Sequence, residues 1–344
     1  MPPSQHQTTH DVLFHGADSV AKTAARQFYF AKPGDDRNHH IHIHHVHGKD
    51  MEKPASHMWY CRYHGYGSLK KNVDISAIKK QQRILVINEK TLYLKKLIAK
   101  FAQYVNEHYD IVISPYEISG YEGRWIRLPC LMWHYGIETK ELKRRVMLWA
   151  RPRQPTSHAI WARILSSKRQ QKTRILSVFC SGKLRAGRHK QRRQFVEALK
   201  DAMGDDAHVY GHGYDDKEKR QRFIANKADG LDPYRYTIAL ENQTIPHFWS
   251  EKIPDAYLGE AYPFYYGCAN LGDYFPAQAF TPIDIFDIEG SIKTIKDVCH
   301  SPLWEERYPY ILEAKRRVIE DYHLKNILRR IIEGDESLYE KTGV

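Results

Sequence analysis

Hydrophobic and polar positions follow a regular pattern from about residue 82 onward, and their spacing predicts alternating strands and helices. Residues 83–90, RILVINEK, form a short apolar run that is typical of a buried strand. Residues 92–109 carry apolar side chains at helical spacing, and residues 110–117, DIVISPYE, again indicate a strand. A strand–helix–strand order of this length predicts a parallel α/β unit.

A second α/β series follows a basic stretch at residues 151–173, which holds two prolines and which we interpret as an interdomain connection. We expect strands at 174–182, 208–214, 234–242 and 262–267, helices at 188–203, 217–228 and 250–259, and a helical tail after Pro302. Two such series predict two Rossmann-like domains that face each other across a cleft. The expected boundaries are 1–160 for the N-terminal α/β domain, 161–305 for the second Rossmann-like domain, and 306–344 for the tail.

Candidate ligand-binding residues follow from the strand ends, because ligands of open parallel sheets bind beyond the carboxyl ends of the strands. This rule selects Glu89, residues 181–182, residues 211–214, and the pair Glu241–Asn242.

The stretch ENQTIPHFWSEK, residues 241–252, carries the densest candidate chemistry. Ser250 is a favourable N-cap, which would place Glu251 and Lys252 in the first turn of a helix. The exposed N–H groups of a helix start suit a phosphate, and Lys252 would add a full positive charge. Phe248 and Trp249 could stack on a base or a sugar ring. The alternative is an ordinary helix start with solvated charges.

The charge balance narrows the partner classes. Lys and Arg number 53 against 41 Asp and Glu, a net charge of +12, which favours a polyanionic partner: nucleic acid, a phosphorylated ligand or an anionic membrane. No zinc-finger, helix-turn-helix or RNP pattern accompanies the basic runs, so a nucleic-acid-binding protein is the less favoured alternative and we expect no nucleic acid partner.

The cysteines and the start of the chain bear on the compartment. The five cysteines form no C-x-x-C pair, which favours a reducing compartment. No window is apolar enough for a membrane span, and the first residues do not resemble a signal peptide. We therefore expect a cytoplasmic protein.

The His-rich segment at residues 39–47 alternates histidine with isoleucine, which suits a strand with one polar face. A zinc site needs ligands from converging elements, and a single strand does not supply them. We therefore expect a solvated strand face and no metal.

Residues 236–270, YTIALENQTIPHFWSEKIPDAYLGEAYPFYYGCAN, resemble the signature of the family 10 glycosyltransferases, the α-1,3/4-fucosyltransferases. The spacing between the EN pair and the EK pair matches that family without a gap. Residues 179–200 resemble the opening of its donor domain, with Arg192 at the motif arginine, and residues 108–129 place Arg124 and Arg127 at its two arginines. Residues 83–90 put Glu89 at the catalytic glutamate. The resemblance covers about residues 80–300, and the first 75 residues show no match.

The resemblance implies a GT-B enzyme that uses GDP-β-L-fucose, inverts the anomeric centre, and fucosylates a glycan hydroxyl, with O3 of an N-acetylglucosamine-type acceptor as the expected position. The implied roles are Glu89 as general base, with Glu117 and Glu122 as alternatives; Arg192 and Lys252 as cations that neutralise the departing diphosphate; Glu251 and Asn242 as ligands of the ribose or sugar; and Tyr214 and Phe248 as the lining of the nucleotide pocket. Such catalysis needs no metal or other cofactor. A GT-B transferase that uses a different nucleotide sugar remains the closest alternative.

Five residues depart from the family pattern. Asn88 and Lys90 flank the expected base in place of Gly and Asn, Phe248 stands at a usual Tyr, and Trp249 replaces a Val. Ser250 stands in place of Thr and keeps a hydroxyl at the expected N-cap. The basic amphipathic tail could contact the anionic inner face of a membrane, where lipid-linked glycans are built, or it could pack back onto the N-terminal domain.

Overall fold

The computed structural model describes residues 12–16, 41–46, 58–62, 65–69, 83–87, 98–129, 133–136, 164–166, 169, 171–180, 188–211 and 226–340. The chain divides into two compact units: unit 1 comprises Met1–Met132 and Tyr322–Val344, and unit 2 comprises Trp133–Asp321. These boundaries differ from the expected ones at 160 and 305. The reason is local bonding, because residues 133–136 hydrogen-bond within unit 2 and residues 322–340 contact the sheet of unit 1.

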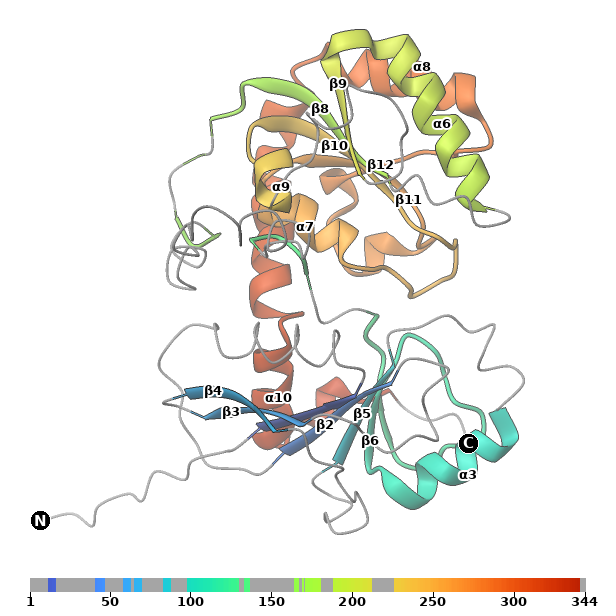
Figure 1. The fold of residues 1–344 in the computed structure, drawn as a ribbon, viewed down its shortest axis with the longest axis vertical. Helices are drawn as coiled ribbons and strands as arrows, with labels where there is room; N and C mark the ends of the chain where they lie inside the picture. Colours follow the sequence, from blue (N-terminus) through green and yellow to red (C-terminus); the bar gives the residue numbers. More distant parts are fainter. Residues whose placement is uncertain are drawn as a thin grey trace, which may run out of the picture. The chain divides into compact units, whose positions relative to one another are not determined.

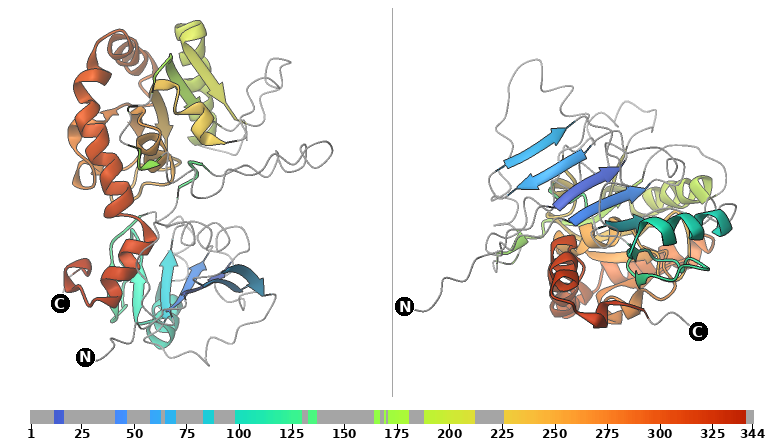
Figure 2. Two further views of the ribbon diagram at one scale, coloured as in Figure 1. Left: turned by 90° about the vertical axis from the view of Figure 1, so that its left-hand side faces the viewer. Right: turned by 90° about the horizontal axis from the view of Figure 1, so that it is seen from below.

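Unit 1 is built on a seven-stranded mixed sheet with the order β4-β3-β1-β2-β5-β6-β7. The strands are β1 (Val12–Gly16), β2 (Ile41–Val46), β3 (Met58–Arg62), β4 (Gly65–Leu69), β5 (Arg83–Ile87), β6 (Ile111–Ile113) and β7 (Arg124–Ile126). Strand β3 runs antiparallel to β1 and β4, and the remaining pairs are parallel (Figure 2). The His-rich segment is strand β2, as predicted, but it lies inside the sheet between β1 and β5. The exposure of its side chains is outside what the structure describes.

The core of unit 1 that the structure describes lies between the sheet and helix α3 (Ile98–His108). Leu85 of β5, Val112 of β6 and Trp125 of β7 share one face of the sheet and pack with Val105 and Tyr109. These positions follow the periods of 2 and 3.6 that the sequence shows, so the predicted strand–helix–strand unit is confirmed.

The tail is two helices instead of one. Helix α9 (Leu303–Glu320) belongs to unit 2, and α10 (Leu324–Ile332) belongs to unit 1. After α10 and the short helix η8 (Glu336–Leu338), the Glu340 N–H donates to the Trp125 carbonyl at 2.9 Å, and the Glu340 carboxylate lies 3.3 Å from Arg127 Nε. The tail is therefore part of both cores and not a separate domain.

Unit 2 has a five-stranded, wholly parallel sheet with the order β12-β11-β10-β8-β9. Its strands are β8 (Arg174–Phe179), β9 (Ala207–Tyr210), β10 (Tyr234–Leu240), β11 (Tyr262–Tyr266) and the two-residue β12 (Thr281–Pro282). The chain adds β9 on one side of β8 and then returns to place β10 on the other side. This reversal creates a topological switch point between β8 and β10, where open α/β sheets bind their ligands.

Helices cover both faces of this sheet, because right-handed crossovers in opposite directions place their helices on opposite faces. Helix α6 (Arg188–Met203), which leads from β8 to β9, packs beside α8 (Ile288–Cys299), whereas α7 (Lys252–Leu258), which leads from β10 to β11, packs beside α9 (Figure 1). Helix α6 has the predicted bounds. Helix α8 and the two-residue strand β12 are not among the predicted elements.

Two findings bear on the environment of the protein. No helix in the described ranges is both long and apolar enough to cross a membrane. Of the cysteines that the structure describes, Cys180, Cys268 and Cys299 are buried and unbonded to one another.

Candidate functional site

A small pocket lies at the carboxyl ends of β8 and β10 in unit 2, beside the switch point. Its lining comes from strands, helix α7 and the helical turn η5 (Lys227–Gly230), and it consists of Phe179, Lys227, Leu231, Thr237, Ile238, Ala239, Lys252 and Asp255. Of the EN…SEK block, Lys252 lines this pocket.

Glu241 organises the loop that leaves β10. Its side chain is only 1% exposed, and its N–H donates to the Tyr266 carbonyl at 2.7 Å, which extends the pairing of β10 with β11 by one residue. The carboxylate accepts hydrogen bonds from the Ser250 N–H at 2.8 Å and from the Ser250 hydroxyl at 2.7 Å, and it contacts Lys252 Nζ at 3.2 Å. Glu241 therefore joins the strand end to the start of α7 and is not one half of a carboxylate dyad.

The predicted N-cap is wrong. Glu251 occupies the N-cap position, with helical φ and ψ of −52° and −15° and no capping hydrogen bond from its side chain. Ser250 lies one residue before the N-cap position, and its hydroxyl donates to Glu241. Helix α7 spans only seven residues, so few peptide dipoles add up at its start, and the positive charge of the site comes chiefly from side chains.

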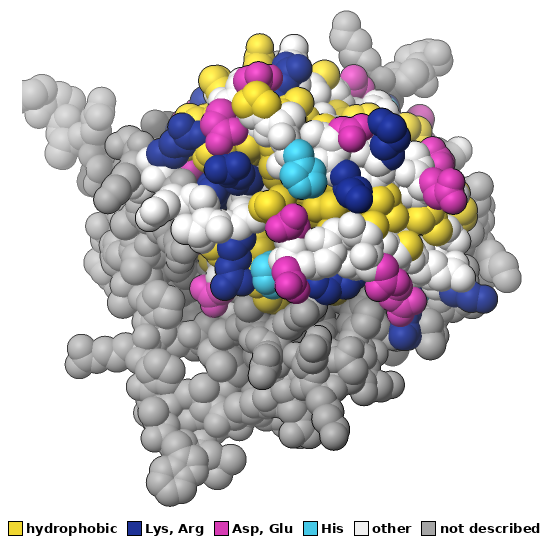
Figure 3. All heavy atoms as spheres, turned by 90° about the horizontal axis from the view of Figure 1, so that it is seen from above, with side chains coloured by type: hydrophobic (Ala, Val, Ile, Leu, Met, Phe, Trp, Pro, Cys, Tyr) yellow, Lys and Arg dark blue, Asp and Glu magenta, His cyan; other side chains and the backbone are white. Residues whose placement is uncertain are grey.

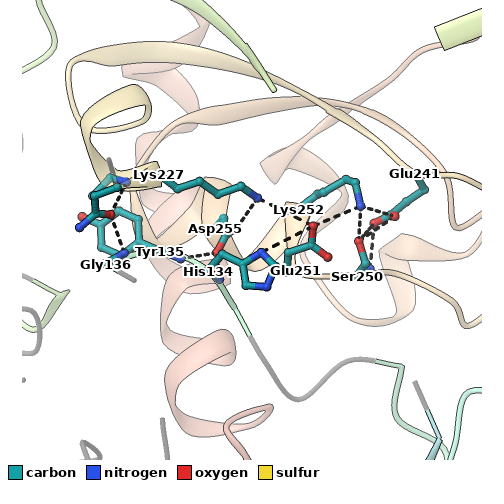
Figure 4. A network of polar contacts seen from close by, with 11 residues as sticks. His134, Tyr135, Gly136, Lys227, Glu241, Ser250, Glu251, Lys252 and Asp255 are labelled. Carbon is teal, nitrogen blue, oxygen red and sulfur yellow. Dashed lines mark hydrogen bonds and ion pairs between the residues drawn. The ribbon is translucent and has the colours of Figure 1, made fainter. Parts of the chain in front are cut away.

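Lys252 and Glu251 form the centre of a chain of alternating charges (Figure 4). Lys252 Nζ lies 2.7 Å from the Ser250 hydroxyl and 3.3 Å from Glu251 Oε1. Burial lowers the pKa of Lys252, but Glu241 and Glu251 outweigh it, so that this pKa lies above its usual range. Burial alone would raise the pKa of Glu251. The positive charges of Lys252, Lys227 and His134 outweigh burial, so that this pKa is lowered and the carboxyl stays ionised.

Arg192, on the first turns of α6, is a buried cation whose described contacts include no carboxylate. The side chain is 6% exposed, and one of its terminal nitrogens donates to Asn242 Oδ1. Arg192 Nε has no hydrogen-bond partner among the described residues. Since a buried charge is costly unless it is paired, this guanidinium is suited to an anion that the described residues do not supply.

The two aromatic candidates lie in the interior. Trp249 is 1% exposed and packs on the rings of Tyr274 and Phe275, with centroids 5.9 Å and 5.5 Å away. Phe248 is 7% exposed. Trp249 is therefore a core residue and offers no face to a ligand, whereas the role of Phe248 in the nucleotide pocket stays a prediction.

Three residues of the network were not found from the sequence: Lys227, Asp255 and His134. Asp255 is 2% exposed; its Oδ2 accepts from Lys227 Nζ at 2.6 Å, and its Oδ1 accepts from the N–H groups of His134 and Tyr135 at 2.6 and 2.7 Å. The only local signal is Asn226, whose side chain caps η5 and places Lys227 at its first residue. Nothing in the sequence pairs Lys227 with a residue 28 positions later.

The remaining predicted residues divide into two groups. Glu89, Tyr214 and residues 181–182 lie outside the described residues. Glu117 and Glu122, the alternative bases, are exposed in unit 1.

The family arginines of unit 1 are paired: Arg124 Nη2 lies 2.5 Å from Asp110, and Arg127 contacts Glu340. No group of three or more His, Cys, Asp or Glu side chains is placed to hold a metal ion in the part of the chain that the structure describes.

Comparison with known proteins yields similarity at the level of structure alone. No protein-family model and no curated protein matches the chain. An α1,3-fucosyltransferase solved with GDP-fucose is similar over 94% of this chain and 95% of that chain, with 13% identity and a TM-score of 0.47. An α1,3-fucosyltransferase solved with GDP gives 14% identity and a TM-score of 0.45 over 93% and 94%. A TarM mutant from S. aureus, solved with UDP, gives 10% identity and a TM-score of 0.39 over 82% and 67%.

These values assign neither donor, acceptor nor mechanism. The predicted fold class is confirmed in that the chain forms two α/β units with largely parallel sheets, as a GT-B glycosyltransferase does. The arrangement of the two units across a cleft stays a prediction.

Proposed function

We propose that the chain is a glycosyltransferase that moves L-fucose from GDP-β-L-fucose to a glycan hydroxyl, with inversion at the anomeric carbon. The observation that carries the proposal is the buried Arg192, whose Nε has no hydrogen-bond partner in the described part of the chain and whose guanidinium donates to Asn242 of the EN…SEK block. A guanidinium in this state suits a phosphate oxygen, which accepts charge-assisted hydrogen bonds.

Lys252 adds a second cation, because it contacts Glu241, and the next residue, Asn242, accepts the hydrogen bond from Arg192. Two cations at the carboxyl ends of β8 and β10 suit the diphosphate of a nucleotide sugar. As the bond from the sugar C1 to the phosphate oxygen breaks, negative charge builds up on GDP, and these cations would stabilise it. No metal or other cofactor is needed for this task, so we expect activity to persist in EDTA.

The other half of the reaction is assigned to Glu89, on the resemblance alone. Its carboxylate would accept the proton of the acceptor hydroxyl as the oxygen forms its bond to C1, and the nucleotide would leave from the opposite side of the sugar. Glu89→Gln should therefore retain GDP binding and abolish transfer. Wild-type turnover in this variant would move the base to another glutamate, with Glu117 and Glu122 tested next.

The decisive assay presents GDP-fucose, other GDP-sugars and UDP-sugars with an N-acetyllactosamine panel, and determines product linkage by NMR. We expect GDP-fucose to be consumed, with fucose on O3 of N-acetylglucosamine. Lys252→Ala should weaken transition-state stabilisation by about 2–4 kcal/mol. Reaction of UDP-sugars without reaction of GDP-fucose would contradict the fucosyl assignment and favour a transferase for another nucleotide sugar.

A nucleic-acid-binding role finds no support on the surface of unit 2 that Figure 3 displays. Lys and Arg side chains there are interspersed with Asp and Glu and do not form one continuous basic patch (Figure 3). The net charge of +12 is explained more simply by an anionic substrate than by a nucleic acid partner.

We place the enzyme in the cytoplasm, with the tail in peripheral contact with an anionic membrane. Leu324, Ile327 and Leu328 of α10 are each 1% exposed, so the apolar face of this helix is already buried within the protein. A lipid surface would meet basic side chains such as the exposed Arg329, and binding would be electrostatic and sensitive to salt. Co-sedimentation of the full chain with anionic vesicles at low and high salt tests this contact, and binding that does not weaken at high salt would contradict it.

A further inference from the structure

Glu251 receives its cationic neighbours on one oxygen only. Lys252 Nζ, Lys227 Nζ and His134 Nδ1 lie 3.3, 3.8 and 4.0 Å from Glu251 Oε1, and none of these contacts is made to Oε2 (Figure 4). The carboxylate is 24% exposed, so a ligand can reach it. An ionised carboxylate with one oxygen held by cations presents the other as an acceptor for hydroxyl groups.

Lys227 is itself held in place by a buried partner. Its Nζ lies 2.6 Å from Asp255 Oδ2 and 5.4 Å from the centre of the Phe179 ring. Asp255 cannot turn away without losing two further hydrogen bonds, because its Oδ1 accepts from the N–H groups of His134 and Tyr135. The two residues His134 and Tyr135 therefore fix Asp255, and the ring of His134 lies beside Glu251.

The distances separate two possible roles of Lys227. At 2.6 Å it is hydrogen-bonded to Asp255, whereas at 3.8 Å it acts on Glu251 through charge and not through a hydrogen bond. Its Nζ is thus engaged and does not need a phosphate as partner, unlike the buried Arg192.

We propose that Lys227, fixed by Asp255, is a positioning residue that holds Glu251 with Oε2 turned to the ribose hydroxyls of the bound nucleotide. This inference rests on the proposed function, because it takes a ribonucleoside diphosphate as the ligand of the pocket. Lys227 and Asp255, neither of which belongs to the EN…SEK block, would thereby make the site selective for a ribose that carries both hydroxyls.

Isothermal titration of GDP and of 2′,3′-dideoxy-GDP tests the proposal on the full chain. Wild-type protein should bind GDP about tenfold or more tightly than the dideoxy nucleotide, since a hydrogen bond to a charged group contributes about 1.5–3 kcal/mol. Lys227→Met should lose most of this preference and bind dideoxy-GDP with nearly unchanged affinity. Lys227→Arg should restore the preference in part, and Lys227→Met combined with Glu251→Gln should be no worse than Glu251→Gln alone.

Lys172→Met is the matched control. Lys172 is a half-buried lysine whose Nζ donates at 2.6 Å to the carbonyl of Gly259, directly after α7, and no contact of Lys172 with Glu251 is described. The Lys172→Met variant should keep the preference for GDP over the dideoxy nucleotide. Thermal unfolding of every variant checks that each one is folded.

Three results would count against the proposal in different ways. An unchanged preference in Lys227→Met, or an equal loss of both nucleotides, would overturn the positioning role and leave the proposed function standing. Wild-type protein that binds neither GDP nor GDP-fucose would overturn the proposed function, and this inference with it.

Discussion

Gly267 lies so close to Glu241 that a side chain at position 267 would collide with the γ-methylene group of Glu241, whose carboxylate organises the site. A Cβ on Gly267 would fall 2.5 Å from Glu241 Cγ and 2.4 Å from the Tyr265 hydroxyl. The glycine that directly follows β11 therefore leaves the space that the side chain of Glu241 occupies, and through Glu241 it bears on Ser250 and Lys252.

Gly267→Ala should displace Glu241 and weaken its hydrogen bonds to Ser250. We expect a loss of about 1–3 kcal/mol in the free energy of unfolding, as for other overpacked sites, together with weaker GDP binding. Urea denaturation and nucleotide titration measure the two effects. Gly272→Ala is the control, since a Cβ there meets nothing within 4 Å, and equal effects of both substitutions would refute this account of Gly267.

Arg192→Met should move stability and donor binding in opposite directions. Removing a buried charge whose Nε has no partner in the described structure should leave the free energy of unfolding unchanged or raise it by about 1 kcal/mol. The same change should weaken GDP binding by about tenfold or more, because a charge-assisted phosphate contact is lost. Urea denaturation in the absence of nucleotide, beside titration with GDP, checks both halves. A strong loss of stability would show that Arg192 serves folding.

The ionisation of Glu251 predicts a pH dependence of stability. Its pKa in the folded protein is lowered from 4.5, since burial, which raises it, is outweighed by Lys252, Lys227 and His134. The resulting stabilisation is fully present above about pH 4.5 and is lost as the pH falls through the lower folded pKa. The difference in unfolding free energy between wild type and Glu251→Gln should therefore be smaller at pH 3 than at pH 7. A difference that grows toward acid pH would contradict this assignment.

Lys315 and Glu260 form a buried ion pair away from the pocket, with Nζ 2.6 Å from Oε1. Lys315→Met should cost about 3–5 kcal/mol, because it leaves the carboxylate buried without its cation. Glu260 has a left-handed φ of 52°, which glycine adopts without strain. Adding Glu260→Gly to Lys315→Met should therefore recover a large part of the loss, as measured by urea denaturation. A double variant less stable than the single one would contradict this.

Sequence periodicity was enough to find the elements that carry the site. Residues 188–203 are helical with the predicted bounds because their apolar positions recur at helical spacing and bury Phe195 and Leu199. Strands β8, β10 and β11 were found because apolar runs that are buried on both faces are unambiguous at this length. Helix α8, residues 288–299, received no assignment from the sequence pattern.

The contacts of the site could be predicted from the sequence only where both partners lie in the same segment or in a recognised motif. Ser250 was assigned to the wrong role because its hydroxyl can cap a helix or bond a carboxylate, and sequence alone does not show that Glu241 lies within 2.7 Å. Lys227, Asp255 and His134 come from three separate segments that only the fold brings together, and no spacing rule connects them.

The division of the chain has a consequence for the order in which the protein folds during synthesis. Unit 2 is one continuous stretch, Trp133–Asp321, whereas unit 1 also needs the segment that begins at Tyr322. The N–H of Glu340 bonds to Trp125, so this part of unit 1 stays open until residue 340 has left the ribosome. We expect unit 2 to reach its native packing first, although it is translated second, because unit 1 is complete only after its closing segment has been synthesised.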